Sequence, residues 1–523
     1  MTNGAPTRVE QQVQASVLAR EILTFVQKGK NAEAAELAMQ NIAAAAEHGR
    51  LAQIAMLAFA RHGARDAATS LAEKVMNKPD LESDVALPVA QHLLETGRSK
   101  DALHLAQSAL GRAPTALPRL NLVAAQAALQ EGGDVAVALG YLDEVISKVE
   151  QDLPFLRTYG ELLLIAGRNR EAVDVLSRAA ALAPKIANVQ VLFSRALKQA
   201  HRYEEACAVM QVAVSIDPSP AMRRLATAAL LQAGDEGAAE KLYTTMIAER
   251  KARLKPTFAE EIEALKERAV AVKIPPQRLE WAWQIAARRL GHDPSTDRAD
   301  WELRAKWGHL MDQALMDWLE CSTNSASEIL HYFDDLEPAS KVLLEAHAKG
   351  KGVLLASAHI GLMFAGPVAL HAIGKPYRWV ASTPRITTTT FANALISTSD
   401  LSEAQVARRV IDALKGGYGV TLAVDGAMSP SAPRIEWEGR SVTYSDFTSM
   451  LSFRLGTPTV FVSPYWHEGR IHFVANALPT ARPEESPNEF TARWRAAFFD
   501  EVRDQFVRGP ENLRLNGGIW RDV

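Results

Sequence analysis

A histidine follows an uncharged apolar stretch in the second half of this chain. Residues Gly352–Ala358 read GVLLASA, and His359 comes directly after them, two residues before a glycine. An apolar run of this length predicts a buried strand, and side chains at strand ends are those that a sheet presents to substrates. Because imidazole accepts and returns protons near neutral pH, His359 is a candidate general base. The alternative is a hydrogen-bonded histidine of the core.

Several further sequence features follow this histidine along the chain. A strand ends in His-x-Gly at His359, a strand ends in Asp425, the segment Trp437–Arg440 precedes a hydroxyl-rich helix start, and the tail reads PENLRLNGGIW. This order resembles the lysophospholipid acyltransferase superfamily, and within it the late acyltransferases of lipid A synthesis. The resemblance runs from about residue 279 to the end of the chain, and it implies acyl transfer from a thioester to a hydroxyl.

The acid of the family motif is missing. In that family the histidine begins a His-x4-Asp or His-x4-Glu motif and acts as general base, while the acid orients the imidazole and stabilises its charge. Phe364 occupies the acid position here. Asp425, which ends the run GVTLAVD, is the leading substitute, and Glu438 is the weaker one. The alternatives are a turn cap for Asp425 and a solvated loop ion pair for Glu438.

The resemblance also implies how an acceptor could be held. Gly439 and Arg440 match the family's region that contacts an anionic group of the acceptor, for which a guanidinium fork suits phosphate better than lysine does. Arg385, in the segment STPRITTTT, matches a turn over the cleft. We therefore expect Arg385, Glu438, Gly439 and Arg440 to bind substrate. The alternative for both arginines is an exposed surface charge.

The elements that must position these residues alternate between strand and helix patterns. Helical patterns such as 401–415 and 447–455 lie between β-rich runs, which are Gly352–Ala358, Tyr377–Ala381, Gly419–Asp425, Thr457–Pro464 and Arg470–Ala475. This alternation predicts a mostly parallel sheet covered by helices, in an α/β domain over residues 341–523. The uncharged run 352–374 is long enough to suggest a membrane span, but histidine, glycine and proline residues interrupt it.

The first half of the chain is a helical repeat. Alanines recur about every 34 residues, with one shift of two; they are Ala34, Ala68, Ala102, Ala136, Ala138, Ala172 and Ala206. In three units a proline, Pro114, Pro184 or Pro218, follows at the same offset and would end the second helix. These residues resemble the tetratricopeptide repeat, which implies an all-α superhelix over residues 1–250 that binds a peptide or protein partner. The alternatives are an unrelated helical bundle and repeats that only dock on the second half.

Residues 251–340 are expected to form a helical bridge. Lys255–Pro256 and then Pro275–Pro276 break the repeat register. Five tryptophans follow, namely Trp281, Trp283, Trp301, Trp307 and Trp318. Because aromatic side chains at helical spacing usually belong to a core, we expect most of these rings to be buried. The alternative is a membrane-interface face or the mouth of a lipid pocket.

Composition excludes several classes of protein. The formal net charge of −3 argues against a nucleic-acid binder, and two cysteines fit a reducing cytosol. His467 and His472 lack a third ligand, so no metal site is expected, and no glycine-rich phosphate loop has the required spacing. The first residues lack the apolar core of a signal peptide, so we expect a cytoplasmic protein with at most peripheral contact at the inner face of the cytoplasmic membrane.

Three hypotheses follow for the whole chain. The first is an acyltransferase that moves an acyl group from acyl-coenzyme A or acyl carrier protein to a hydroxyl of a lipid or glycan in cell-envelope synthesis, with His359 as base and no bound cofactor. The second is a non-catalytic binding or assembly protein with a degenerate cleft and partner-recruiting repeats. Phe364 favours the second, since removing the orienting acid of a serine–histidine–aspartate triad costs about ten-thousandfold in turnover. A third hypothesis is transfer of another group, such as a sugar.

Overall fold

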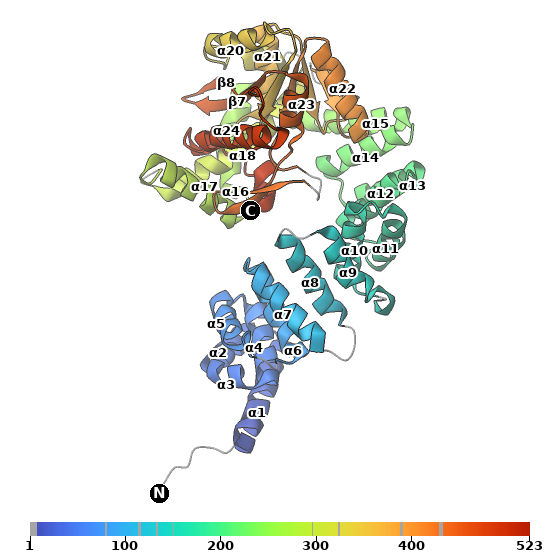
Figure 1. Ribbon diagram of the computed structural model, residues 1–523, viewed down its shortest axis with the longest axis vertical. Helices are drawn as coiled ribbons and strands as arrows, with labels where there is room; N and C mark the ends of the chain where they lie inside the picture. The colour runs from blue at the N-terminus through green and yellow to red at the C-terminus, as the bar shows by residue number, and fades with distance from the viewer. Residues whose placement is uncertain are drawn as a thin grey trace. The chain divides into compact units, whose positions relative to one another are not determined.

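The computed structural model divides into two compact units, Met1–Arg202 and Tyr203–Val523. It describes residues 8–78, 81–112, 117–131, 134–149, 151–294, 297–322, 325–387, 391–427 and 432–523. Figure 1 labels most helices of both units and, among the strands, β7 and β8. Among the described residues, no helix is both long enough and apolar enough to span a bilayer.

The first unit consists of short helices that pack on their neighbours in sequence. They are α1 (Arg8–Gln27), α2 (Asn31–Gln40), α3 (Ile42–Glu47), α4 (Gly49–His62), α5 (Arg65–Val75), α6 (Ser83–Glu95), α7 (Ser99–Arg112), α8 (Pro118–Gln130), α9 (Val135–Asp143), the 3₁₀ turn η1 (Ile146–Lys148), α10 (Leu153–Ile165), α11 (Asn169–Leu182) and α12 (Ala187–Gln199). Consecutive pairs such as α6 with α7 and α10 with α11 are in contact along their length.

The repeated small residues explain why these helices can approach closely. Ala102 and Ala172 are fully buried, and a Cβ atom built on Gly160 of α10 would lie 2.4 Å from the Leu176 side chain of α11. Pro184 follows the end of α11, as the repeat pattern predicted, whereas Pro114 lies outside the described residues. The first unit is therefore a stack of tetratricopeptide-like helical repeats, as predicted.

The second unit begins with helices and continues as an α/β domain. Its helices are α13 (Tyr203–Ile216), α14 (Pro220–Gln232), α15 (Glu236–Lys251), α16 (Phe258–Ala271), α17 (Pro276–Leu290), α18 (Arg298–Cys321), α19 (Ser325–Leu330), α20 (Glu337–His347), α21 (Gly366–Ile373), α22 (Glu403–Lys415), α23 (Phe447–Leu455) and α24 (Pro487–Gln505). Its 3₁₀ turns are η2 (Met363–Ala365), η3 (Ala392–Ala394), η4 (Pro510–Asn512) and η5 (Gly518–Asp522).

The main sheet has the strand order β3-β2-β4-β1-β7-β8 in the described part of the chain. Its strands are β1 (Val353–Ser357), β2 (Tyr377–Ala381), β3 (Leu395–Ser397), β4 (Gly419–Ala423), β7 (Thr459–His467) and β8 (Arg470–Ala477). All neighbours are parallel except β7 and β8, so the predicted mostly parallel sheet is present. A separate antiparallel ribbon, β5 (Arg434–Trp437) with β6 (Arg440–Thr443), was not predicted.

Helices cover both faces of the main sheet. Val353 and Leu355 of β1 belong to one apolar cluster with α18, α20 and α21, whereas Leu354 belongs to another with Val410 and Leu414 of α22. Successive side chains of a strand point to opposite faces. The sheet is therefore the middle layer of three, and the run 352–374 forms a strand, a turn and a short helix rather than a membrane span.

Most of the tryptophans belong to the core, as expected. Trp281, Trp301 and Trp318 are at most 4% exposed. The Trp281 ring makes edge contacts with Trp437 and Trp520, at centroid distances of 5.6 and 5.7 Å. These rings join α17, the β5–β6 ribbon and the C-terminal tail into one apolar cluster, which fixes the tail against the sheet.

The boundary between the units differs from the one expected at residue 250. Helices α14 and α15 carry the last repeat pattern, but their polar side chains are bound inside the second unit. Arg224 Nη2 lies 3.0 Å from Glu320 Oε2, Tyr243 donates to Glu320 Oε1 at 2.7 Å, and Arg250 also pairs with Glu320. Burial alone would raise the pKa of Glu320, but the two arginines hold it below its ordinary value.

Candidate functional site

The structure brings His359 and Asp425 together at the carboxyl ends of β1 and β4. These strands are parallel neighbours, with Ser357 opposite Ala423, so the residues that follow them meet at one edge of the sheet. His359 Nδ1 lies 2.9 Å from Asp425 Oδ1, and the His359 backbone N–H donates to the same oxygen at 2.8 Å. This contact leaves Nε2 as the ring nitrogen that can act as a base.

The C-terminal tail closes around this pair. The Ile519 N–H donates to Asp425 Oδ2 at 3.0 Å, and Trp520 Nε1 donates to the His359 carbonyl at 3.1 Å. Gly518 has φ +46°, and a Cβ atom there would lie 2.0 Å from Asp425 Oδ2 and 2.5 Å from His359 Cβ. The tail therefore packs directly on the histidine and aspartate, and only glycine fits at position 518.

Asp425 is buried but well supplied with hydrogen-bond donors. Its residue exposure is 2%, so burial alone would raise its pKa. The charge and hydrogen bond of His359, with the N–H groups of Ile519 and His359, instead hold the pKa of Asp425 below its ordinary value. Asp425 is therefore an ionised partner that fixes the imidazole.

His359 opens onto a cavity of about 300 Å³. Its side chain is 20% exposed, so it is not sealed in the core. Apolar side chains line much of the cavity, and they include Ile360, Met363, Phe364, Leu370, Trp379 and Phe473. Two arginines, Arg514 and Arg521, also line it. A hollow with apolar walls and a few convergent polar groups is typical of a ligand site.

Phe364, at the position of the family's acid, faces this cavity. Its ring packs against Trp379 in an edge contact at 6.2 Å and against the Arg514 guanidinium at 5.6 Å. Its N–H lies 3.4 Å from Oδ1 of Asp312, a buried carboxylate of α18. No carboxylate reaches His359 from position 364, and Asp425 occupies that role from β4.

Arg385 does not line the cavity. Its guanidinium forms an ion pair with Glu236 of α15, and its N–H donates to Asp400 Oδ2 at 2.7 Å. The side chain therefore points from the β2–β3 connection toward helix α15. This corrects the expectation that Arg385 lies over the cleft.

Glu438, Gly439 and Arg440 also lie away from His359, at the turn of the β5–β6 ribbon and its second strand. They line a separate open hollow with α17. Glu438 pairs with Arg288 at 2.6 Å and with Arg503 at 2.5 Å, and its carbonyl accepts from Trp281 Nε1. The segment therefore anchors the ribbon to α17 and α24, and the prediction that it shares a substrate with His359 is not met by this geometry.

The sequence analysis missed two cavity residues, Arg514 and Arg521, and the buried Asp312 that pairs with Arg514. Asp312 Oδ2 lies 2.9 Å from Arg514 Nε, and Arg521 Nη1 donates to the Gly426 carbonyl at 2.8 Å at the exposed mouth. The two arginines belong to the tail ENLRLNGGIWRDV, next to the glycines that pack on the dyad. That tail was part of the family resemblance, but its charges had no predicted partner. Among the described residues no three metal-ligating side chains cluster.

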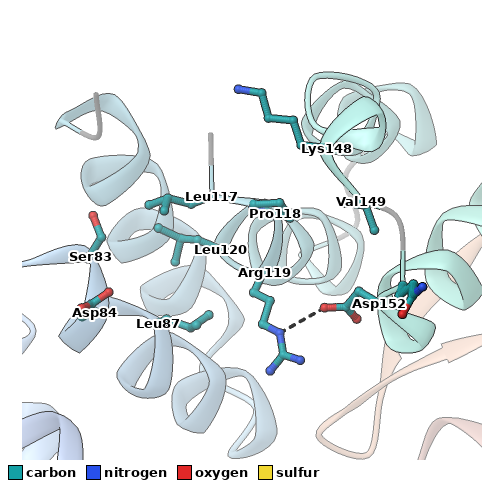
Figure 2. Close-up of a pocket in the computed structure, with 11 residues that line it drawn as sticks. Ser83, Asp84, Leu87, Leu117, Pro118, Arg119, Leu120, Lys148, Val149 and Asp152 are labelled. Atoms are coloured by element: carbon teal, nitrogen blue, oxygen red, sulfur yellow. Dashed lines mark hydrogen bonds and ion pairs between the residues drawn. The ribbon is translucent and has the colours of Figure 1, made fainter. Parts of the chain in front are cut away.

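The first unit has a hollow of its own, shown in Figure 2. It has a volume of about 450 Å³ and lies between the N-terminal ends of α6 and α8 and the residues before α10. Leu87, Leu117 and Leu120 form apolar walls, and Arg119 Nε lies 3.1 Å from Asp152 Oδ2 across it. A protein partner for the repeats stays a prediction.

Comparisons with known proteins find two relatives whose names refer to polysaccharides. No family model matches it. It is 37% identical over 366 residues to the Vi polysaccharide export protein VexE of Salmonella typhi, a match that covers 70% of this chain and 55% of that protein. It is 33% identical over 156 residues to the cellulose synthase 2 operon protein C of Komagataeibacter xylinus, covering 29% of this chain and 12% of that protein. The chain thus spans about half the length of the first relative.

Solved structures of MamA also match, with low scores. MamA from Desulfovibrio magneticus RS-1 is 20% identical, with a TM-score of 0.29 and coverage of 33% of this chain and 96% of that one. MamA of AMB-1 is 24% identical, with a TM-score of 0.28, and covers 32% of this chain and 98% of that one. The match to VexE is longer than either unit, so it must include residues of both. The resemblance to lysophospholipid acyltransferases has no support in these matches and stays a prediction.

Proposed function

We propose that this chain serves polysaccharide export, and that its second unit transfers an acyl group from a thioester to a hydroxyl of a glycan or its lipid carrier. The export context comes from the similarity to VexE. The chemistry is supported by one observation above others: His359, held by Asp425 at 2.9 Å, faces an apolar cavity with a free ring nitrogen.

The geometry supports the following step. The acceptor O–H bond breaks as its proton moves to His359 Nε2, and the oxygen forms a bond to the thioester carbonyl carbon. The carbonyl π electrons move onto oxygen, and their return breaks the C–S bond. The leaving thiolate takes the proton from His359, so the base is regenerated. Asp425 stabilises the imidazolium between the two proton transfers.

The cavity also fits the two kinds of substrate that this reaction needs. An acyl chain favours the apolar walls around Leu370, Trp379 and Phe473, where each buried methylene contributes about 0.8 kcal/mol. Arg521, at the mouth, forms no ion pair with a described carboxylate and suits a phosphate of the carrier or acceptor.

The test compares the full chain with His359→Ala in a transfer assay. Purified protein is incubated with labelled acyl-coenzyme A or acyl carrier protein thioester and a membrane extract. We expect at least a thousandfold loss for His359→Ala. His472→Ala is a matched control, because His472 also pairs with an aspartate, Asp334 at 3.2 Å, but lies outside the cavity. Equal rates of acyl transfer by the unaltered chain and by His359→Ala would contradict the proposal.

The second candidate is a binding or assembly role without catalysis. VexE is named for export rather than for a reaction, and the similarity includes both units. In this hypothesis the repeats recruit a partner and the cavity only holds a ligand. Complementation separates the two candidates: if His359→Ala and Asp425→Asn restore polysaccharide export fully in cells that lack this chain, the binding role is favoured.

A further inference from the structure

The cavity beside His359 contains a cation to which the proposed function gives no chemical role. We propose that Arg514 stabilises the oxyanion that forms when the acceptor oxygen attacks the thioester carbonyl, and that Asp312 is the residue that positions it. This inference rests on the proposed function, because it names a further group for the same reaction.

Arg514 is held from three directions and still lines the cavity. Its Nε lies 2.9 Å from Asp312 Oδ2, its Nη1 lies 2.9 Å from Met363 Sδ, and its guanidinium lies 5.6 Å from the Phe364 ring centroid. The side chain is 20% exposed. Its second terminal nitrogen, Nη2, has no hydrogen-bond partner among the described residues. At least one N–H group of a fixed guanidinium is therefore available to a ligand.

Phe364 explains why the guanidinium of Arg514 is available to a ligand. An acid at this position would lie against the guanidinium and take up its remaining N–H groups. The phenyl ring instead offers a weakly attractive face without a competing oxygen. The departure from the family motif therefore does two things: it leaves Asp425 as the partner of His359, and it leaves Arg514 open toward the cavity.

Asp312 fixes the direction of the guanidinium. Its carboxylate is 2% exposed and accepts from the Phe364 N–H, so its position is set by α18 and by the backbone next to η2. Burial raises the pKa of Asp312, and Arg514 opposes this shift most strongly. A buried carboxylate with one strong cationic partner holds that partner in place, so Arg514 needs little reorganisation when charge develops on the substrate.

His359 and Arg514 line the same cavity, and the charge of His359 is among the influences that lower the pKa of Asp312 against the effect of burial. Before reaction, Asp425 is negative and the Arg514 guanidinium, paired with Asp312, is positive. Proton transfer makes His359 positive at the moment when the carbonyl oxygen becomes negative. Arg514 donates to that oxyanion until the C–S bond breaks and the carbonyl reforms, and it neither gains nor loses a proton.

The decisive experiment measures kcat and KM for acyl-coenzyme A with Arg514→Met. Loss of an oxyanion donor lowers kcat by about 10²–10³, with KM changed by less than about threefold. Arg508→Met is a matched control, since Arg508 lies just before the tail and stacks on an aromatic ring, Tyr465 at 4.4 Å, outside the cavity. We expect its kinetics to match the unaltered chain. Unchanged kcat in Arg514→Met, or a loss confined to KM, overturns the inference.

Two further variants separate a chemical role from a structural one. Added guanidinium ion should restore part of the activity of Arg514→Gly and none of that of His359→Ala; no restoration in a folded Arg514→Gly contradicts the inference. Asp312→Asn should lower kcat about tenfold while the folded state is retained, as a positioning residue predicts. Thermal unfolding of each variant checks folding, and Arg514→Lys, which keeps a charge beside Asp312, replaces any variant that fails to fold.

These outcomes are distinguishable from failure of the proposed function. If His359→Ala is inactive and Arg514→Met keeps its kcat, acyl transfer stands and the role of Arg514 falls. If His359→Ala keeps full transfer, or the unaltered chain turns over no thioester, both fall.

Discussion

The His359 cavity and the β5–β6 ribbon both join charged side chains from distant segments, but they use them differently. In the ribbon, Glu438 binds Arg288 and Arg503 with its two carboxylate oxygens. In the cavity, Asp425 fixes one nitrogen of His359, and the other nitrogen has no hydrogen-bond partner among the described residues. We infer that a charged motif is structural when the fold uses all of its hydrogen-bonding groups. It is a candidate for chemistry when one hydrogen-bonding group remains for a ligand.

The sharpest way to test this contrast is Asp425→Asn. The amide keeps the shape of the carboxylate but cannot stabilise the imidazolium, so we expect kcat for acyl transfer to fall by about 10⁴. Asp334→Asn is the control, because Asp334 pairs with His472 away from the cavity. Turnover within tenfold of the unaltered chain would contradict the role given to Asp425.

Gly518→Ala should have the next largest effect. The added methyl group meets Asp425 Oδ2 and His359 Cβ, so the pair must separate, and we expect at least a hundredfold loss of kcat. Gly469→Ala controls for backbone strain alone, since Gly469 has φ +80° and open space around its Cβ position. Similar kinetics in both variants would show that the tail does not hold the dyad.

Glu438→Gln tests the other side of the comparison. The change weakens two ion pairs of a half-buried carboxylate, so we expect a loss of about 1–3 kcal/mol in the free energy of unfolding. We also expect kcat per folded molecule to stay unchanged, since this segment lies outside the cavity. Chemical denaturation and a transfer assay measure the two quantities, with Glu436→Gln on the same ribbon as control. A selective loss of kcat would return this segment to the active site.

The smallest effect is expected in the pH dependence of stability. The pKa of Asp425 is below its ordinary value in the folded chain, so its contribution to stability is present above about pH 4 and is lost as the pH falls through the folded value. The free energy of unfolding of the unaltered chain should therefore decrease more between pH 5 and pH 3 than that of Asp425→Asn. Parallel curves for the two proteins would contradict the ionised pair.

Part of this arrangement could be predicted from the sequence. The apolar runs before His359 and Asp425 predicted two buried strands, and their neighbouring parallel placement brings the two side chains together. Alanine spacing likewise predicted the helical repeats. Both inferences depend on patterns within single elements, which sequence preserves.

The remaining features depend on packing between distant segments. Arg514 meets Asp312 only because a tryptophan cluster holds the tail against the sheet, and no local pattern records that contact. The repeat pattern of α15 continues to residue 250, whereas α15 belongs to the second compact unit, where its buried arginine pairs with Glu320. The sequence analysis assigned charged residues near the family motifs to a substrate, whereas in the structure these residues pair with other parts of the fold.

Whether His359 acts as a base is measured most directly by the rate of thiol release from acyl-coenzyme A, for the unaltered chain and for His359→Gln. The rate is measured with and without a membrane extract as acceptor. We expect release that depends on the extract and falls at least a thousandfold in the variant. Equal rates for the two proteins would contradict it.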